Sequence, residues 1–204
     1  MPVLEIPHFS IQPGEQSVLI GRSGGGKTTL LHLIAGLTTP DEGSIRVGDI
    51  ELTQLSEAGR DRYRAAMLGY VFQTFNLLPG FTALENVRLG MSFASGRHDL
   101  GRAHELLARV GLADRADYRP SQLSVGQQQR VAIARALSSK PKLLLADEPT
   151  GSLDKKGAAN IADLLAELNQ SMKLTLVVVT HSEELADRME KVYRISEGAI
   201  SEDR

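Results

Sequence analysis

A glycine-rich stretch at residues 21–29 constrains this 204-residue chain more than any other feature of its sequence. The stretch reads Gly-Arg-Ser-Gly-Gly-Gly-Lys-Thr-Thr and fits the pattern G-x-x-x-x-G-K-[ST] of a phosphate-binding loop. Glycines let a backbone turn tightly and approach a phosphate with no Cβ in the way. The motif predicts a nucleoside triphosphate as ligand, without saying how its energy is used. It assigns nine residues to phosphate binding: Gly21, Arg22, Ser23, Gly24, Gly25, Gly26, Lys27, Thr28 and Thr29.

The segments on either side of the loop agree with this interpretation. Residues 16–20 are largely apolar, which predicts a buried strand, and residues 28–35 have a helical pattern that stops at Gly36. A helix start offers unpaired N–H groups and the positive end of the helix dipole to a phosphate. Lys27 would reach the β- and γ-phosphates, and the Thr28 hydroxyl would bind Mg²⁺. The alternative is a plain glycine turn between strand and helix, which the two flanking segments make less favoured.

Apolar strands alternate with helical segments along the rest of the chain. Strands of the core are expected at residues 16–20, 68–72, 142–146 and 174–180, and helices at residues 55–66, 158–169 and 183–189. Shorter strands are expected at residues 3–11, 44–47, 191–195 and 199–200, the last two as a hairpin. Residues 84–137 are mostly helical in pattern. The sequence therefore predicts an α/β fold with a mainly parallel sheet and a helical insert.

Two adjacent carboxylates follow one of the most apolar strands. Asp147 and Glu148 come directly after residues 143–146, at the carboxyl edge where open α/β sheets bind ligands. One carboxylate can hold Mg²⁺, and the next can orient and deprotonate an attacking water. The alternative is a solvated strand end that leads into Pro149. Beside a phosphate-binding loop, the pair is predicted to serve the metal and the catalytic base.

A helix is expected to begin at Ser124 and to run to about Leu137. Ser124 and Gln127 have the spacing of a capping box, which alone can explain both residues. The functional alternative is a second phosphate site, in which Gly126 permits close approach to the exposed N–H groups. The motif by itself does not decide between the two.

Two further polar residues follow predicted strands. His181 comes after residues 174–180, where it could polarise or sense a γ-phosphate, although an isolated histidine more often makes structural hydrogen bonds. Gln73 comes after residues 68–72, where it could contact Mg²⁺ or the attacking water. Alone, Gln73 is an ordinary loop residue.

The composition limits the classes of partner. The net charge is −2, which does not favour a nucleic-acid binder, and the absence of cysteine excludes a disulfide framework. No basic segment followed by an apolar one opens the chain, and no apolar run approaches the roughly 20 residues that span a bilayer. A role at a membrane would therefore need an integral membrane partner.

The motifs taken together resemble the ATP-binding subunit of an ABC transporter. Residues 21–28 match the Walker A motif, Gln73 the Q-loop, residues 123–127 the signature, residues 143–147 Walker B, Glu148 the catalytic glutamate, residues 152–154 the D-loop and His181 the switch histidine. The resemblance spans nearly the whole chain, and the order of the motifs makes it specific. Within the family, residues 72–86 are most similar to the lipoprotein-releasing and macrolide-exporting group.

This resemblance implies one ABC ATPase domain over residues 1–204. Its RecA-like P-loop NTPase core would comprise residues 1–75 and 139–204, with a small N-terminal antiparallel β portion, and its helical subdomain residues 76–138. It implies ATP and Mg²⁺ as ligands, with Thr28, Gln73 and Asp147 at the metal and Glu148, His181 and Gln73 in catalysis. It also implies a head-to-tail homodimer in which Ser124, Gly126 and Gln127 of one chain meet the ATP of the other.

The resemblance further implies an integral membrane permease as partner and a peripheral position on the cytoplasmic face of the inner membrane. The alternative within the family is an ATPase that regulates a membrane protein without transport, as in cell division. Two features depart from the family pattern. Val125 stands where the signature usually has glycine, and of the candidates for stacking on adenine, His8 and Phe9, neither aligns cleanly. Phe9 is more simply explained as a core residue.

Overall fold

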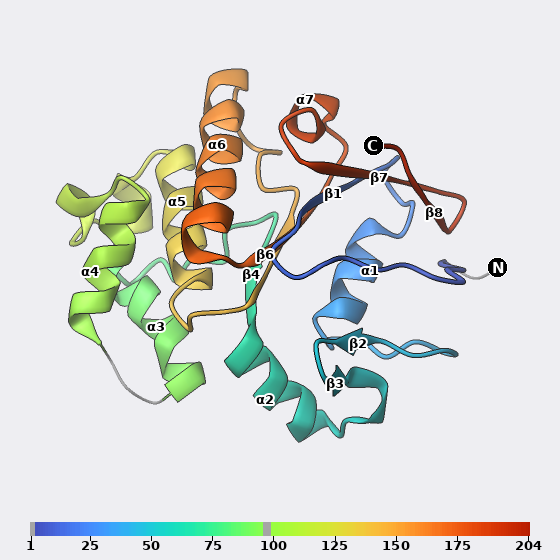
Figure 1. Cartoon of the computed structure of the whole chain (residues 1–204). Coiled ribbons are helices and arrows are strands. Elements are labelled where there is room, and N and C mark those ends of the chain that lie inside the picture. Colours follow the sequence, from blue (N-terminus) through green and yellow to red (C-terminus); the bar gives the residue numbers. More distant parts are fainter. Residues whose placement is uncertain (1–2, 96–98) are drawn as a thin grey trace.

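A computed structural model describes residues 3–95 and 99–204, and its centre is a six-stranded sheet (Figure 1). The strands lie in the order β4-β5-β6-β1-β7-β8. All neighbouring pairs are parallel except β7 and β8, which form an antiparallel hairpin. The bounds are β1 Gln16–Ile20, β4 Leu68–Val71, β5 Leu143–Asp147, β6 Thr175–Thr180, β7 Lys191–Ser196 and β8 Ala199–Glu202. The predicted mainly parallel sheet is thus confirmed, with its core strands close to the expected positions.

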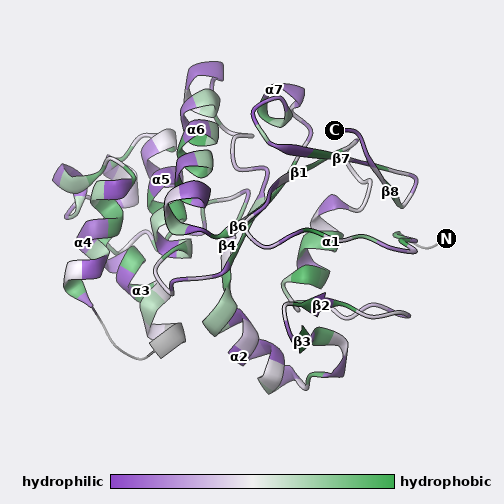
Figure 2. Ribbon diagram, in the orientation of Figure 1, coloured by the Kyte–Doolittle hydropathy of each residue, from purple (hydrophilic) through white to green (hydrophobic). Residues whose placement is uncertain are grey.

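Each face of the sheet has its own hydrophobic core, because successive side chains of a strand point to opposite faces. On β1, Val18 and Ile20 join a cluster that includes helices α3 (Ala83–Ser95), α4 (Leu100–Arg109), α5 (Val125–Ala136) and α6 (Lys155–Met172). Leu19 instead joins the cluster on the other face, with Leu30 and Leu31 of α1 (Lys27–Ile34). The central strands are buried on both sides, which explains their continuous apolar sequences. Figure 2 shows hydrophilic residues mainly on the outward sides of the helices.

The helical part of the chain packs against one side of the sheet through α5. Gly69 on β4 permits this contact, because an added Cβ would lie 2.5 Å from the carbonyl oxygen of Ala136. Gly90 on α3 has the same role within the helical part, since a Cβ there would lie 2.3 Å from the Ser138 Oγ. Two 3₁₀ turns, Ala113–Arg115 and Pro120–Gln122, connect α4 to α5. None of the helices among the described residues is long and apolar enough to span a bilayer.

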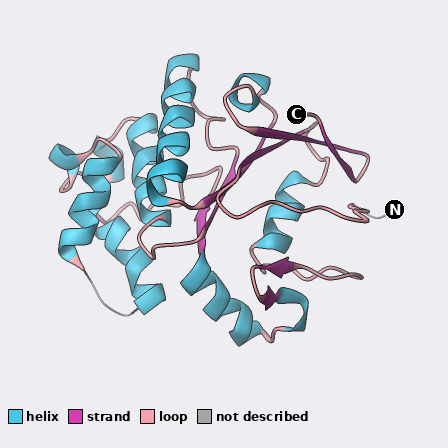
Figure 3. Cartoon of the chain, in the orientation of Figure 1, coloured by secondary structure: helices cyan, strands magenta, loops and turns pink. Residues whose placement is uncertain are grey.

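A small antiparallel sheet lies apart from the main one (Figure 3). It consists of β2 (Arg46–Val47) and β3 (Ile50–Glu51), joined by a turn at Gly48, and leads through the 3₁₀ turn Leu52–Gln54 to helix α2 (Glu57–Met67). This is the antiparallel β portion of the predicted fold class, and the edge strand expected at residues 44–47 is found as β2.

The prediction of one or two strands at residues 3–11 is wrong, because the structure describes all of these residues and has no strand among them. Their alternating apolar side chains pack onto the α1 side of the core, and Phe9 stacks edge-on against Tyr193 with ring centroids 5.0 Å apart. The Glu5 N–H of this segment donates a backbone hydrogen bond to the carbonyl of Gly198, in the turn between β7 and β8, at 2.8 Å. Because β1 already has β6 and β7 as neighbours, no edge of it is free for pairing. Helix α7 (Glu183–Ala186) is also shorter than expected, and α6 is longer at both ends.

Candidate functional site

The glycine-rich loop lies between the end of β1 and the start of α1, as its sequence predicts. Gly24 and Gly26 have φ angles of 81° and 88°, in the left-handed region that favours glycine. Gly26 is the N-cap of α1 and supplies no side-chain cap, so the N–H groups of the first turn remain available to a ligand. Gly21 lies against β7, where a Cβ would come within 2.5 Å of the Ile195 carbonyl oxygen.

Lys27 is the first residue of α1 and is almost fully buried, with 7% of its surface exposed. Its ammonium donates hydrogen bonds to the carbonyl oxygens of Gly21 at 2.7 Å and Arg22 at 3.0 Å. These bonds use two of the three N–H groups of the ammonium. The loop therefore holds a positive charge against its own backbone, at the place where its N–H groups also gather.

Thr28 links the loop to the neighbouring strand. Its hydroxyl donates a hydrogen bond to Asp147 Oδ1 at 3.2 Å, across 119 residues of sequence. Burial raises the pKa of Asp147, and the bond from Thr28 partly opposes this rise. A hydroxyl and a carboxylate oxygen at this separation are the hard oxygen ligands that Mg²⁺ prefers. Thr28 and Asp147 therefore fit a magnesium ion whose other ligands would be water and phosphate oxygens. In the described part of the chain, no group of three or more acidic, histidine or cysteine residues could hold a metal.

Glu148 has a strained backbone and a firmly held side chain. Its φ of 44° lies in the left-handed region, which costs a non-glycine residue roughly 1–2 kcal/mol. Thr180 donates a hydrogen bond to Glu148 Oε2 at 2.9 Å, and His181 Nδ1 lies 2.8 Å from Oε1. The Glu148 side chain is only 11% exposed, whereas that of His181 is 63% exposed. The last residue of β6 and the histidine that follows it thus fix this carboxylate at the carboxyl edge of the sheet.

The predicted site residues differ in how directly the structure brings them together. Thr28 and Asp147 are in contact, as are Glu148 and His181, and Lys27 lies one residue from Thr28. Gln73 lies two residues beyond β4, which is the parallel neighbour of β5, so it reaches the same edge of the sheet, exposed. The roles of these residues remain predictions.

The signature segment presents a helix start to solvent. Ser124 is the N-cap of α5 and forms the predicted capping box, in which its hydroxyl accepts from the Gln127 N–H at 3.3 Å and the Gln127 side chain accepts from the Ser124 N–H at 2.9 Å. Val125 is 44% exposed. A Cβ added to Gly126 would meet only the Leu153 side chain, at an ordinary 3.8 Å. Within one chain α5 packs mainly against α3, β4, α4 and α6.

Sequence reasoning missed two residues of this region. Thr180 holds the Glu148 carboxylate, and its position just before His181 is a signal that could have identified it. Arg135 on α5 donates to the carbonyl oxygen of Phe75 at 2.7 Å and to that of Asn76. No local pattern connects residues 60 positions apart, so this contact was not predictable from the sequence.

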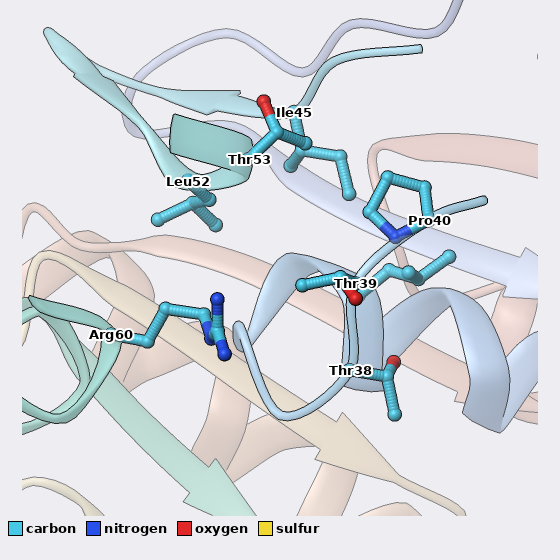
Figure 4. A pocket seen from close by; sticks show the side chains of 8 residues that line it. Thr38, Thr39, Pro40, Ile45, Leu52, Thr53 and Arg60 are labelled. Atoms are coloured by element: carbon cyan, nitrogen blue, oxygen red, sulfur yellow. The ribbon is translucent and has the colours of Figure 1, made fainter. Parts of the chain in front are cut away.

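A hollow elsewhere on the surface does not compete with this site. It lies where the end of α1 faces α2 and the small sheet (Figure 4). Its lining comprises Leu33, Thr38, Thr39, Pro40, Ile45, Leu52, Thr53 and Arg60. The hollow has no room for a water molecule at its centre, so it is a packing gap and not a ligand pocket.

The raised pKa of Asp147 predicts an effect on stability. Because the folded state holds this proton more tightly than the unfolded chain, stability falls as the pH rises through the folded-state pKa. At pH 7 the buried carboxylate is therefore destabilising, and Asp147→Asn should raise the melting temperature of the nucleotide-free protein, by roughly 2–4 °C for each kcal/mol regained. The gain should disappear as the pH is lowered through the folded-state pKa toward the lower pKa of the unfolded chain.

Asp163→Asn is the control. Because the Asp163 side chain is 67% exposed, this substitution should change the melting temperature little. An equal or lower melting temperature for Asp147→Asn at pH 7 would contradict this electrostatic assignment.

Comparison with known proteins identifies the family. The family model described as ABC transporter matches residues 4–151. The lipoprotein-releasing system ATP-binding protein LolD 2 of Rhodopirellula baltica is 43% identical over 99% of this chain and 82% of its own length. The corresponding LolD of Coxiella burnetii is 43% identical, covering 98% of this chain and 87% of that protein. The macrolide export ATP-binding/permease protein MacB of Rhodopirellula baltica is 45% identical over the whole chain, which spans 30% of that longer protein.

Solved structures agree with the sequence relatives. A dimeric ATP-binding cassette in a post-hydrolysis state, bound to ADP and Pi, superposes with a TM-score of 0.89 at 39% identity and covers 99% of this chain and 91% of its own. A second dimeric structure of the same cassette, described as a bacterial ABC transporter cassette, gives a TM-score of 0.88 at 40% identity, with the same coverage. With the family model and relatives above 40% identity in agreement, the chain belongs to the ABC transporter family, as an ATP-binding ATPase subunit with the cassette fold.

Proposed function

We propose that this chain binds ATP with Mg²⁺ at the loop of residues 21–29 and hydrolyses it with Glu148 as general base. The observation that carries the proposal is the convergence of Lys27, the Thr28–Asp147 pair and the Glu148–His181 pair at one edge of the parallel sheet. In open α/β sheets this edge is where ligands bind.

Each residue has a role that follows from its surroundings. The N–H groups of the loop and of the first turn of α1 bind the phosphates, and Lys27 exchanges its carbonyl partners for the β- and γ-phosphate oxygens. Thr28, Asp147 and Gln73 would hold Mg²⁺. The metal would neutralise charge that develops on the phosphate oxygens. The buried Asp147 carboxylate lowers the stability of the fold, and its charge would be needed to bind the ion.

Glu148 is suited to accept a proton from the attacking water. Thr180 and His181 fix its two oxygens, so the carboxylate does not have to be ordered during the reaction. A general base of this kind contributes typically about 10²–10⁴ in rate. His181 is mostly exposed beside it and would contact the γ-phosphate, and Gln73 would orient the water.

The second half of each site would come from another copy of the chain. Ser124, Gly126 and Gln127 lie at an exposed helix start whose N–H groups suit a phosphate. Within one chain this helix packs mainly against α3, β4, α4 and α6. A similar cassette has been solved as a dimer in two structures, one of them with ADP and Pi. A head-to-tail homodimer would place each signature segment on the partner's ATP, and hydrolysis would favour its opening.

The proposed partner is an integral membrane permease, which this chain would meet at the cytoplasmic face of the inner membrane. In support, one named relative is the ATP-binding protein of a lipoprotein-releasing system, and another is a macrolide export protein named for both ATP-binding and permease functions. A candidate docking surface is the loop before α3, where Leu78 and Phe81 are each 40% exposed. The fully buried Asn86 shapes this loop by accepting from the Leu78 N–H at 2.8 Å and donating to three of the loop's carbonyl oxygens. Apolar side chains on a rigid loop suit a protein interface.

Co-purification from native membranes tests the partner and the docking surface together. A tagged Glu148→Gln chain should retain a permease with a large extracytoplasmic domain. Phe81→Asp in the same chain should lose at least about tenfold of it, because a charge replaces an apolar anchor. Leu100→Asp is the matched control, since Leu100 is 49% exposed on α4, away from the loop. A cell-division protein, or no membrane protein at all, would contradict the transport role and leave the ATPase standing. Equal capture by both aspartate variants would contradict the docking surface.

A further inference from the structure

Arg135 connects two segments that the proposed function treats separately. It lies in the last turn of α5, the helix that begins at the signature. Its guanidinium donates to the carbonyl oxygens of Phe75, at 2.7 Å, and Asn76, which lie just beyond Gln73. Carbonyl oxygens that receive a charged, forked donor are held more firmly than those that face water. One side chain thus links the Gln73 segment to the signature helix.

The linked segment has left the sheet and needs such support. Strand β4 ends at Val71, and Asn76 has a φ of 50°, in the left-handed region. The Asn76 side chain accepts a hydrogen bond from the Thr74 hydroxyl at 3.0 Å, which shapes the turn locally but does not attach it to a helix. Arg135 attaches its backbone to α5, and Asn86 on α3 attaches the residues that follow.

The two attachment points belong to one packed unit. Gly90 on α3 lies so close to α5 that an added Cβ would be 2.7 Å from the Arg135 carbonyl oxygen and 3.1 Å from its Cγ. The Ser138 hydroxyl also donates to the Arg135 carbonyl oxygen at 2.7 Å. Because interfaces packed this tightly move as units, α3, α5 and the loop between Phe75 and Thr82 should shift together.

We propose that Arg135 is a positioning residue that makes the signature helix follow the Gln73 segment when that segment responds to nucleotide. The inference rests on the proposed role of Gln73 at the metal and water. The family resemblance places Phe75 in the core, since the expected helical subdomain begins at residue 76. The inference places Phe75 in the moving helical unit instead. Loss of the guanidinium would leave both the loop of residues 21–29 and Glu148 intact, but would uncouple the signature from the site that it must complete in the partner chain.

Steady-state ATPase kinetics test this coupling. Arg135→Met, which keeps the apolar stem, should lower kcat at least about tenfold while leaving the Kd of the monomer for ATP within about twofold, because the loop of residues 21–29 is unchanged. Arg135→Lys, with a compact ammonium in place of the fork, should recover part of the rate and remains testable if the methionine variant does not fold.

Arg130→Met is the matched control. Arg130 also lies on α5 and donates to a backbone carbonyl, that of Val110 at 2.8 Å, but this partner lies within the helical part. If Arg135 acts by coupling and not by tightening the helices, the kcat of Arg130→Met should stay within about threefold of the native value. Native kcat in Arg135→Met, or an equal loss in Arg130→Met, would overturn the inference. A native rate in Gln73→Ala would instead contradict the proposed role of Gln73.

A distance measurement separates coupling from folding. The chain has no cysteine, so spin labels can be attached to introduced cysteines at Gly80, where a Cβ meets nothing within 4 Å, and at the exposed Gln122. In the Glu148→Gln background the label-to-label distance should be narrow and equal with ADP and with MgATP. Adding Arg135→Met should broaden or shift it on MgATP binding. An unchanged distribution in the presence of Arg135→Met would overturn the inference, whatever the kinetics show.

Discussion

Replacing Glu148 by glutamine is expected to lower ATP turnover by about 10²–10⁴, the usual contribution of a general base. Glutamine has the same shape and can keep a hydrogen bond from Thr180, but its amide cannot take a proton from water. Phosphate release at saturating MgATP measures the loss, and the affinity for ATP should be unchanged.

Glu197→Gln is the matched control for this substitution. Glu197 has a φ of 52°, close to the 44° of Glu148, but lies exposed in the β7–β8 turn. It therefore shares the unusual backbone without the site. Turnover of Glu148→Gln within about twofold of native would show that another group accepts the proton.

Replacing Lys27 by alanine is expected to weaken ATP binding by about 10- to 150-fold. This range corresponds to the roughly 1.5–3 kcal/mol of a hydrogen bond to a charged group. The ammonium is buried and already turned toward the loop, where it makes two bonds to backbone carbonyls, so little ordering is needed when phosphate arrives. Calorimetric titration with ATP in the presence of Mg²⁺ measures the change.

Lys155→Ala is the control for the loss of a lysine at a helix start. Lys155 is the first residue of α6, as Lys27 is of α1, but it is exposed and lies away from the loop of residues 21–29. It should bind ATP as the native chain does. Equal affinities for Lys27→Ala and the native chain would remove the basis for placing the phosphates at this loop.

The features of the fold and of the site that the sequence predicts are those encoded by neighbouring residues. The loop, its flanking strand and helix, and the capping box of Ser124 and Gln127 each depend on groups within a few positions of one another. Strand patterns then place Asp147 and His181 at one edge, because parallel strands end on the same side of a sheet.

The remaining features depend on distant contacts that no local pattern encodes. Residues 3–11 alternate like a strand, but both sides of β1 are taken by β6 and β7, and the apolar side chains of the segment pack on the core instead. Thr180 meets Glu148 across 32 residues, and Arg135 meets Phe75 across 60. The homodimer was expected only from the family resemblance, because no local pattern of one chain encodes a contact with a second copy.

The shared site is therefore the central claim, and the mass of the Glu148→Gln chain in solution tests it most directly. Light scattering should give one chain mass with ADP and twice that mass with MgATP, because slow hydrolysis preserves the contacts that close the dimer. Adding Gly126→Asp should return the MgATP sample to the mass of one chain, because a carboxylate would face the partner's phosphates. The monomer should still fold, since a Cβ at Gly126 makes only an ordinary contact with Leu153, at 3.8 Å. A Glu148→Gln chain that stays monomeric with saturating MgATP, or that dimerises equally well with Gly126→Asp, would contradict the account.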